Sequence, residues 1–560
     1  MKKAKVCFIN VPLRDSGDFF PPFGITRLID SLTDSGYQFN TDVFFYNIDL
    51  LRPSFEDMKA YFTQLNPDIV GISAVVSTSY LFVKQVSQLI KEVVPRVSIV
   101  LGGNMAAASE VVLKKTCVHL TVIGEGEDSF VDVCRHWETY GSLTDNPALR
   151  KIRGLAFKSA EDANATVFTG YRDQIPTERI RQANYDIIDD YYMQPIIRGF
   201  GIEDDIRTQK MIEGNRRSAG IELSKGCVSR CTFCHRWNKG YRALDLDSII
   251  DEMQRLIQRH NVGVFYLYDE SFGSDKSHIR SFIKKVKPLN VLWHVHGMRV
   301  KTVTDIALLQ DMKDAGCVAI KFGMESGSDR MLTIMEKLAT RADDNYKALL
   351  ALKETGLLGT TTIQIVYGMP GENRHTVKET IRFIKKCREA KKNIYIAPAL
   401  AQALPGTPLY EFARLHGFIG STLDDEEAYL IRISDTNKAD MKHYINMTEE
   451  KTPDILYGHY LLREMQFNFY WGTRGRIKWV ATTALKILLT PYGFRLFVKM
   501  LVTYRYCDKN LKQAIKLFFE KRPPGLKIET LSLRKIVSQI NPAFEKNDVP
   551  YSVDLLRRGR

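Results

Sequence analysis

The sequence predicts an α/β protein: a doubly wound, Rossmann-like sheet, then a partial (β/α)6 barrel of the TIM type, then a mainly helical C-terminal region. Short apolar strands alternate with amphipathic helices over residues 1–140. The alternation stops over 141–215, resumes over 216–420, and gives way to helical patterns over 421–560. Alternating strands and helices are typical of parallel sheets. We therefore expect two α/β domains, an irregular connector between them and a helical end.

The first domain is predicted from five apolar strand patterns that are each separated by a helical pattern. The strands are "AKVCFINVP", "TDVFFYNI", "DIVGISAV", "VSIVLGG" and "LTVIGEGE". Glycines stand at the ends of several of these strands, at Gly71, Gly102, Gly103, Gly124 and Gly126. Ligands bind at the carboxyl ends of such strands, and glycine lets the backbone approach a large ligand closely. The glycine-rich edge is therefore a candidate binding site.

The second domain is predicted from six further strand patterns, again with amphipathic helices between them. They are "AGIELSKG", "VGVFYLYDE", "VLWHVHG", "CVAIKFGME", "TTTIQIVYGMPGE" and "NIYIAPAL". Six βα units are too many for another small open sheet and too few for a complete eight-stranded barrel. A partial barrel is the simplest interpretation, with its active site at the carboxyl ends of the strands.

Three cysteines follow the first barrel strand in the segment "GCVSRCTFCHRW". Cys227, Cys231 and Cys234 have the spacing C-x3-C-x2-C. A structural zinc site needs four ligands, and His235 directly follows Cys234 and is poorly placed to be the fourth. A redox C-x-x-C would leave Cys227 unexplained. A [4Fe–4S] cluster with one open iron needs three thiolates, so a cluster is favoured over zinc or three unrelated thiols.

This loop resembles that of the radical S-adenosylmethionine (SAM) superfamily, including the aromatic Phe233 before the last cysteine. Four further stretches match the family in order: "YLYDESF" (266–272), "IKFGMESGSDRML" (320–332), "VYGMPGEN" (366–373) and "ALPGTPLYEFARLHG" (403–417). The resemblance implies that SAM chelates the open iron and that one electron cleaves it to a 5′-deoxyadenosyl radical. That electron transfer requires iron, because zinc has no redox chemistry.

The resemblance also assigns residues to SAM. Glu325 could instead be a structural carboxylate, and the Gly-Met-Pro-Gly segment could be only a turn. The implied SAM-binding residues are Phe233, Asp269, Glu270, Ser271, Glu325, Ser326 and Gly368.

The first domain resembles the cobalamin-binding domain that precedes the barrel in one subclass of this superfamily. Many such domains ligate cobalt from below with the histidine of D-x-H-x-x-G, but the first histidine of this chain is His119. If cobalamin binds, something other than a histidine of residues 1–118 meets its lower face; alternatively the fold is kept and the ligand lost. The implied cobalamin-binding residues are Ser73, Ser77, Gly102, Gly103, Gly124, Glu125, Gly126 and Glu127.

The resemblance implies a cobalamin-dependent methyl transfer to an unreactive carbon of a lipid or natural product, with one SAM as methyl source and a second as radical source. Cyclisation or oxidation without methyl transfer is the alternative, and a non-catalytic corrinoid or redox sensor is a third. His294 and His296 alternate on one strand and so share a face. They are candidates to bind substrate or move a proton, or they are packed core residues.

The basic charge of the chain lies in its C-terminal part. The net charge is +14, and residues 471–560 hold 19 Lys and Arg against 6 Asp and Glu. Residues 476–521 mix apolar and basic side chains, which suits either an interfacial helix on anionic lipid or a helical cap on the barrel; nucleic acid is disfavoured. Nine cysteines and the lack of a leader pattern predict a cytoplasmic protein, with peripheral membrane contact and a flavodoxin- or ferredoxin-type electron donor.

Overall fold

The structure is a computed structural model of the chain. It describes residues 3–12, 21–75, 79–162, 164–188, 192–193, 196, 205–235, 240–337, 340–358, 362–392, 394–433, 444–470, 491–507, 509–519 and 532–538.

The N-terminal domain contains a seven-stranded sheet with the order β2-β1-β3-β4-β5-β6-β7. The first five strands are parallel, and β6 and β7 are antiparallel to their neighbours. All five residues of β1 are buried, as expected for a parallel strand that is covered on both faces. The strands are β1 (Val6–Asn10), β2 (Val43–Tyr46), β3 (Ile69–Ser73), β4 (Ser98–Gly102), β5 (Leu120–Val122), β6 (Leu155–Lys158) and β7 (Thr166–Phe168).

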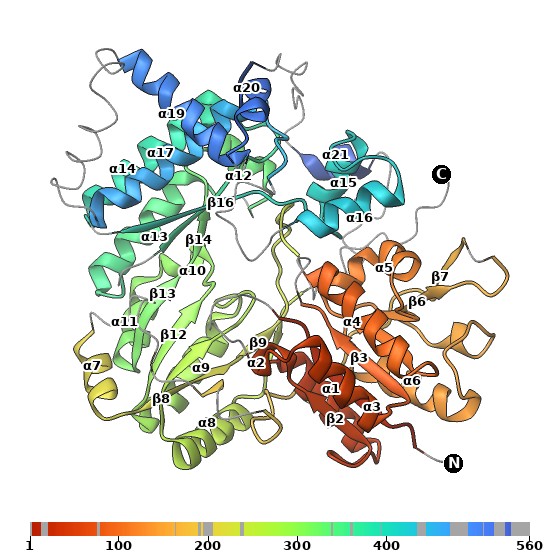
Figure 1. Cartoon of the computed structure of the whole chain (residues 1–560). Coiled ribbons are helices and arrows are strands. Elements are labelled where there is room, and N and C mark those ends of the chain that lie inside the picture. Colours follow the sequence, from red (N-terminus) through yellow and green to blue (C-terminus); the bar gives the residue numbers. More distant parts are fainter. Residues whose placement is uncertain are drawn as a thin grey trace.

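Helices cover both faces of this sheet, which makes it doubly wound as predicted (Figure 1). One core cluster lies under α1 and α6, and another lies under α3, α4 and α5. The helices are α1 (Phe23–Asp34), α2 (Ile48–Leu51), α3 (Phe55–Leu65), α4 (Tyr80–Val93), α5 (Ser109–Lys115) and α6 (Glu127–Tyr140), with short 3-10 helices η2 (Asn104–Ala108), η3 (Leu149–Lys151) and η4 (Thr177–Arg179).

The segment 141–215 was expected to be irregular, and its first part is not. It contains β6 and β7, which add an antiparallel hairpin to the open edge of β5. These strands have four and three residues, so their sequence shows little alternation. Pairing with an existing edge, rather than intrinsic strand propensity, explains them.

The second domain is a partial barrel of parallel strands. Its two sheets have the orders β13-β12-β11-β8 and β14-β15-β16. Because β14 begins two residues after β13 ends, the two sheets continue one another and give six positions around the barrel, as predicted. The strands are β8 (Arg217–Ile221), β11 (Val262–Leu267), β12 (Leu292–His296), β13 (Cys317–Lys321), β14 (Gly323–Glu325), β15 (Thr362–Tyr367) and β16 (Tyr395–Leu400), and a hairpin of β9 (Ser224–Lys225) and β10 (Arg242–Ala243) follows β8.

Amphipathic helices cover the outside of the barrel. In α8, the Asp245 side chain caps the N-terminus, and Ile249, Met253 and Leu256 are buried at intervals of three to four residues. This spacing places one apolar stripe against the sheet. The helices are α7 (Ile206–Glu213), α8 (Leu246–His260), α9 (Lys276–Val286), α10 (Val300–Val303), α11 (Ile306–Asp314), α12 (Asp329–Ile334), α13 (Ala342–Thr355) and α14 (Arg374–Ala390), with the 3-10 helix η6 (Lys287–Leu289).

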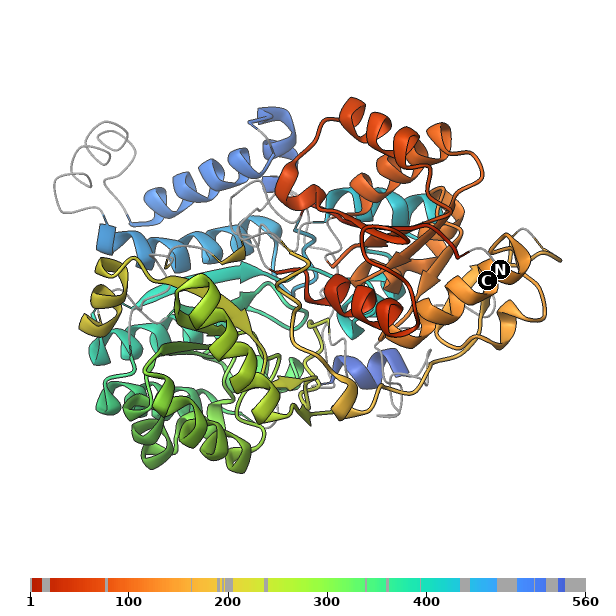
Figure 2. The same ribbon diagram turned by 90° about the horizontal axis from the view of Figure 1, so that it is seen from below.

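The part of the C-terminal region that the structure describes is helical. Helix α16 packs on α4 and α5 of the first domain, and α17 packs on the last barrel strand, β16. Figures 1 and 2 show the two α/β domains side by side, with these helices above them in Figure 1. Among the described residues, no helix is long and apolar enough to cross a bilayer. The helices are α15 (Pro408–Leu415), α16 (Leu423–Arg432), α17 (Thr452–Tyr470), α19 (Pro491–Tyr506), α20 (Leu511–Phe519) and α21 (Leu533–Ser538).

Candidate functional site: a cysteine loop beside a glycine-lined cavity

The cysteine loop begins where β9 ends, at the carboxyl side of the barrel. Gly226 has φ +92°, a left-handed conformation that turns the chain into the loop. Inside the loop, the Thr232 hydroxyl and amide donate to the carbonyl oxygens of Ile334 and Met335, each at 3.1 Å. Phe233 is half-buried against the apolar core. The loop is therefore fixed to the end of α12 by hydrogen bonds and by packing.

The three thiols of the loop lie close enough to influence one another. Cys227 and Cys231 are half-buried and Cys234 is exposed. Burial, together with the charge of Cys227, raises the pKa of Cys231 to about 11, against the opposing effect of the Lys337 ammonium. A metal binds the thiolate rather than the thiol, so binding to this loop releases protons.

The donor set fits a cluster better than a single ion. Within the described residues, no group of three or more His, Cys, Asp or Glu side chains is arranged to hold one metal ion. A zinc ion needs four ligands within about 2.3 Å of its centre, whereas an iron–sulfur cluster takes its thiolates at separate iron atoms. Three thiols on one loop match the second arrangement and are one short of the four ligands of a zinc site.

Glu325 lies beside the thiols at the end of β14. Its side chain is largely buried and accepts a hydrogen bond from Lys337 Nζ at 2.8 Å. Although burial works against its charge, Glu325 raises the pKa of Lys337 above its ordinary value. The backbone of Glu325 has φ +61°, an unusual conformation for a residue other than glycine. Ser326 is buried, and its hydroxyl lies 3.2 Å from that of Thr380.

The side chains that follow β11 have different surroundings. The Asp269 carboxylate is buried, accepts from Leu223 N at 3.2 Å and bonds the Ser224 hydroxyl. Burial raises the pKa of Asp269 to about 7. Glu270 is exposed and lines the cavity described below. Ser271 is buried. Through its bonds to Leu223 and Ser224, Asp269 holds the segment that leads into the cysteine loop.

His294 and His296 point into the barrel, as their alternation predicts. Their rings lie 4.3 Å apart, and Tyr266 lies 5.8 Å from His294 and 6.0 Å from His296. Tyr268 lies 5.5 Å from His296. Burial and the charge of Lys321 lower the pKa of His296 to about 3 and also lower that of His294. Both imidazoles are therefore neutral near pH 7.

Gly368 lies in the turn after β15, with φ +85°. Its amide donates to the Glu372 carboxyl group, and its carbonyl oxygen accepts from the Tyr444 hydroxyl at 3.0 Å. A Cβ at this position would lie 2.6 Å from Tyr444 Oη. The glycine is therefore required by packing against the C-terminal region, and its contact with SAM stays a prediction.

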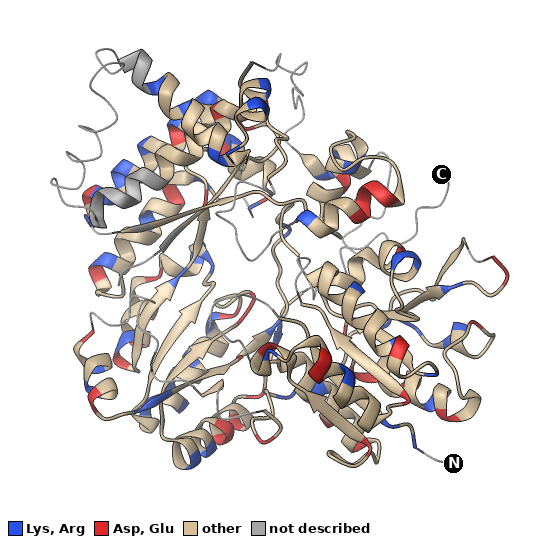
Figure 3. Ribbon diagram, in the orientation of Figure 1, with Lys and Arg blue, Asp and Glu red and all other residues tan. Residues whose placement is uncertain are grey.

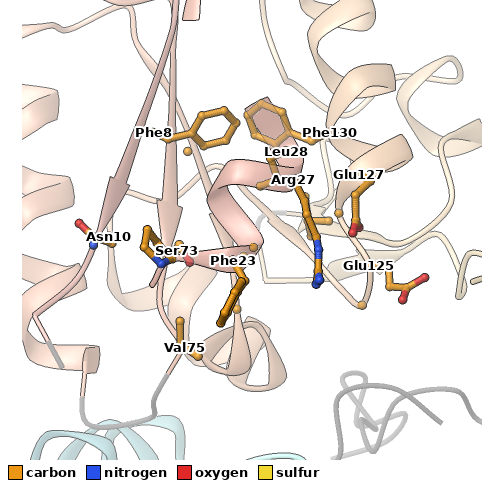
Figure 4. A pocket seen from close by; sticks show the side chains of 18 of the residues that line it. Phe8, Asn10, Phe23, Arg27, Leu28, Ser73, Val75, Glu125, Glu127 and Phe130 are labelled. Carbon is orange, nitrogen blue, oxygen red and sulfur yellow. The ribbon is translucent and has the colours of Figure 1, made fainter. Parts of the chain in front are cut away.

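A cavity of ≈420 Å³ lies between the glycine-rich edge of the first sheet and the mouth of the barrel. Its walls come from both domains: the first contributes all the labelled side chains in Figure 4, and the second contributes Glu222, Ser224, Lys225, Gly226, Tyr268 and Glu270. Gly226 immediately precedes Cys227, so the cavity reaches the cysteine loop. Seven of the predicted cobalamin residues line it: Ser73, Gly102, Gly103, Gly124, Glu125, Gly126 and Glu127. Ser77 lies outside the described residues.

The glycine edge fits a large ligand that approaches the backbone. A Cβ at Gly102 would meet nothing within 4 Å, so the space beside it is open. Gly103 has φ +94°, and a Cβ there would lie 2.3 Å from the Ala74 carbonyl oxygen. These two glycines keep the end of β4 both open and tightly turned, which matches a cradle for a corrin.

His119 has another role in the first domain. Its Nδ1 accepts from the Ile99 amide at 3.0 Å, near the start of β4 and at the opposite end from the glycines. Burial and the nearby Lys91 lower the pKa of His119 to about 4. No histidine is among the described residues that line the cavity. If cobalamin binds there, these residues do not offer it an imidazole ligand.

Sequence reasoning missed a buried network of three cations and three carboxylates between the domains. Lys225 Nζ lies 2.9 Å from Glu125 Oε1 and 3.2 Å from Glu127 Oε1. Arg242 pairs with Glu125, and Arg27 of α1 pairs with Glu222. The members of this interdomain ion network are Arg27, Glu125, Glu127, Glu222, Lys225 and Arg242.

The network changes the interpretation of the two carboxylates that were assigned to cobalamin. Glu125 and Glu127 line the cavity, but their charges are satisfied by Lys225 and Arg242 of the barrel. The only sequence signal was Lys225 standing two residues before Cys227. Lone charges beside a motif do not identify partners about a hundred residues away.

Two family models match the chain in the order that the fold suggests. The "B12 binding domain" matches residues 9–134, and the "Radical SAM superfamily" matches residues 221–384. The first range covers the doubly wound sheet from the end of β1 through β5. The second covers the barrel from the last residue of β8 through most of α14.

Curated relatives match about two-thirds of the chain. The anaerobic magnesium-protoporphyrin IX monomethyl ester cyclase of Cereibacter sphaeroides is 27% identical over 375 residues, which are 65% of this chain and 56% of the cyclase. An uncharacterised methyltransferase of Pyrococcus horikoshii is 27% identical over 369 residues, 64% of this chain and 72% of that protein. The chain spans 56% and 62% of the lengths of the cyclases of C. sphaeroides and Rubrivivax gelatinosus.

Solved structures share the fold. The cobalamin-dependent S-adenosylmethionine radical enzyme OxsB, with aqua-cobalamin bound, aligns with TM-score 0.60 and 17% identity over 92% of this chain and 75% of that one. The radical S-adenosylmethionine methyltransferase TsrM from Kitasatospora setae aligns with TM-score 0.54 and 17% identity, over 74% and 77%. The two domains of this chain are thus of the kinds that hold a [4Fe–4S] cluster with SAM and cobalamin. The chain belongs to the radical SAM superfamily, among the proteins that carry a B12-binding domain before the barrel.

Proposed function

We propose that the chain is a cobalamin-dependent radical SAM methyltransferase that methylates an unreactive carbon of a lipid or natural-product substrate. When bound, the cluster would supply the electron that cleaves SAM and so generates a radical, and cobalamin would carry the methyl group. Cys227, Cys231 and Cys234 would hold the cluster. The glycine edge at Gly102 and Gly103 would hold cobalamin.

The single observation that carries the proposal is the shared cavity. It is bounded on one side by the glycine edge and on the other by Lys225 and Gly226, directly before Cys227. A methyl carrier and a radical source must both reach one substrate carbon, so both must open into the same space. This arrangement argues against a sensor, which has no need to place the two sites together.

The residues of the chain would bind and orient SAM and substrate rather than donate electrons. Glu325 is held in place by Lys337, which favours a fixed contact with SAM. His294 and His296 are neutral, and a pKa of about 3 makes His296 a weak base. We therefore favour substrate binding over proton transfer for this pair.

Cyclisation remains the alternative because two of the relatives are named as cyclases. Methylation is favoured by other relatives, including the cytidylyl-2-hydroxyethylphosphonate methyltransferase of Streptomyces wedmorensis, 23% identical over 50% of this chain and 53% of that protein. In either case a flavodoxin- or ferredoxin-type donor would supply electrons. We propose the boundaries 1–140, 141–215, 216–420 and 421–560 for the functional parts.

Anaerobic reconstitution tests the cofactor assignment. The full chain is expected to hold about four irons and four sulfides and one cobalt, and to release 5′-deoxyadenosine from SAM under reduction. Cys231→Ala should lose the cluster and this product while keeping cobalt. Cys117 is a half-buried cysteine outside the loop, so Cys117→Ala is the matched control. It should keep the iron, the sulfide, the cobalt and the release of 5′-deoxyadenosine. Zinc in the loop, or unchanged cleavage by Cys231→Ala, would refute the assignment.

Methyl-labelled SAM separates methylation from cyclisation. The label is expected in the product, with both S-adenosylhomocysteine and 5′-deoxyadenosine formed. Transformation of a candidate substrate without label in the product would refute methyl transfer and support the alternative.

A further inference from the structure

Helices α19 and α20 carry an unusual concentration of exposed apolar side chains. Five of the fifteen large apolar side chains that are exposed among the described residues lie on these two helices. They are Leu496 (42% exposed), Met500 (37%), Leu501 (40%), Leu511 (56%) and Ile515 (41%).

Most of the exposed side chains form a stripe on each helix, beside the side chains that pack on the protein. In α19, Val498 and Val502 are buried against Leu456 of α17. Leu496 and Met500 are four residues apart, as are Leu511 and Ile515 in α20, and residues four apart share a helix face. Ala514 of α20 is buried and adjoins this stripe, because it lies three residues after Leu511. The two helices contact one another, so their exposed apolar stripes belong to one region of the surface.

Basic residues flank these stripes. Residues 491–519 contain six Lys and Arg and one Asp. Lys499 pairs with Asp454 of α17, whereas Arg505, Lys509, Lys512 and Lys516 are exposed. Figure 3 shows blue residues on the helices at the top, where the labels of Figure 1 place α19 and α20.

We propose that α19 and α20 dock the protein on an anionic membrane surface. Apolar side chains between exposed cations are the pattern of a helix that lies in the lipid interface. Neither described helix is long and apolar enough to span the bilayer, which leaves the interface as the fitting position. Nucleic acid would use the cations but would leave Leu496, Leu501 and Leu511 in water. The inference does not depend on the proposed chemistry, but it would bring the barrel to a membrane-dissolved substrate.

Vesicle sedimentation with the full chain tests the proposal. The protein is expected to bind vesicles of phosphatidylcholine with phosphatidylglycerol, and to bind less as salt rises, because cations and lipid headgroups are screened. Lys512→Gln with Lys516→Gln should weaken binding about 25-fold, since each cation near such a surface contributes about fivefold. Leu496→Glu with Leu511→Glu should weaken binding more than tenfold.

Leu350→Glu is the matched control for the apolar changes. Leu350 lies on α13 and is 39% exposed, close to the value for Leu496, and its substitution should leave vesicle binding unchanged. Each variant is compared with the parent by circular dichroism, and only variants with the parent spectrum are used. If Leu496→Glu with Leu511→Glu disturbs the spectrum, Lys512→Gln with Lys516→Gln decides the question alone.

Four results would overturn the proposal. The first is a failure of the full chain to bind the anionic vesicles at low salt, and the second is equal binding to neutral vesicles. The third is binding to duplex DNA or RNA but not to vesicles. The fourth is a dimer in light scattering that Leu496→Glu disrupts, which would mean that a second copy of the chain covers this surface. Cofactor loading and 5′-deoxyadenosine formation are scored separately, so failure of the proposed enzyme chemistry would not alter any of these readings.

Discussion

Removal of the Lys225 charge is the strongest test of the interdomain ion network. Lys225 contacts Glu125 at 2.9 Å and Glu127 at 3.2 Å, and the three side chains are only 10%, 4% and 10% exposed. Lys225→Met keeps the aliphatic stem and removes the ammonium. Glu127 then loses its cation, while Glu125 keeps Arg242.

The expected magnitude follows from this asymmetry. Breaking a buried pair by removing one partner costs about 3–5 kcal/mol because an uncompensated charge stays buried. Since Glu125 retains a second cation, we expect the lower end, about 3 kcal/mol. Glu127→Gln in the same chain removes the stranded charge, so the double variant should recover about 1–3 kcal/mol.

Native-state hydrogen exchange measures this effect where it occurs. A chain of several domains does not unfold in one step, so local opening of residues 224–227 is more informative than a global midpoint. Lys59→Met is the control, because Lys59 and Glu56 form a pair that is 40% and 82% exposed. Such exposed pairs contribute about 0–1 kcal/mol.

The reasoning would be wrong if Lys225→Met changed local exchange no more than Lys59→Met. It would also be wrong if adding Glu127→Gln to Lys225→Met increased the loss of local stability instead of reducing it. Iron content is measured in parallel, because Lys225 is two residues from Cys227 and a loosened strand should reduce cluster loading. Full loading together with faster exchange would mean that the network acts on stability alone.

Three further predictions follow from the site. Gly103→Ala should destabilise the first domain by about 1–3 kcal/mol from φ +94° alone, whereas Gly102→Ala should keep thermal stability and lower cobalamin retention in gel filtration; equal effects would contradict the cradle. Burial raises the pKa of Glu372 to about 8, so its contribution to stability is full below about pH 4 and is lost as pH rises to 8. Native-state hydrogen exchange at residues 362–373, corrected for the intrinsic exchange rate, should therefore show a slope of up to about 1.4 kcal/mol per pH unit between pH 5 and 8 that Glu372→Gln removes, and an unchanged slope would count against it. Lys337→Met should raise the Kd for SAM at least about tenfold with iron content unchanged, measured by equilibrium dialysis; an unchanged Kd would leave the Glu325 pair structural.

Local patterns predicted the strands, the cysteine loop and the glycine edge because each is written in consecutive residues. The burial of β1 and the stripe of α8 follow directly from their apolar spacing. The hairpin of β6 and β7 was missed because its three- and four-residue strands exist through pairing with β5.

Long-range contacts could not be predicted in the same way. Gly458 lies inside α17, where a glycine is normally unfavourable. A Cβ there would lie 1.9 Å from Tyr367 Oη, so this glycine lets α17 approach β15. The sequence near residue 458 gives no indication that Gly458 packs against Tyr367, 91 residues earlier. The same holds for Arg27 and Glu222, which are 195 residues apart.

The missed contacts also change what counts as the cobalamin site. The glycine edge belongs to the first sheet, but the cavity beside it is closed by Lys225, Tyr268 and Glu270 of the barrel. Lys225 and Arg242 of the barrel also neutralise Glu125 and Glu127 at that edge, which would otherwise be buried without cations. A fragment that ends at residue 140 lacks these groups together with β6 and β7, so its failure to take up cobalamin would say little about the whole chain. The cradle is a property of two domains in contact, and cofactor binding has to be judged on the full-length protein.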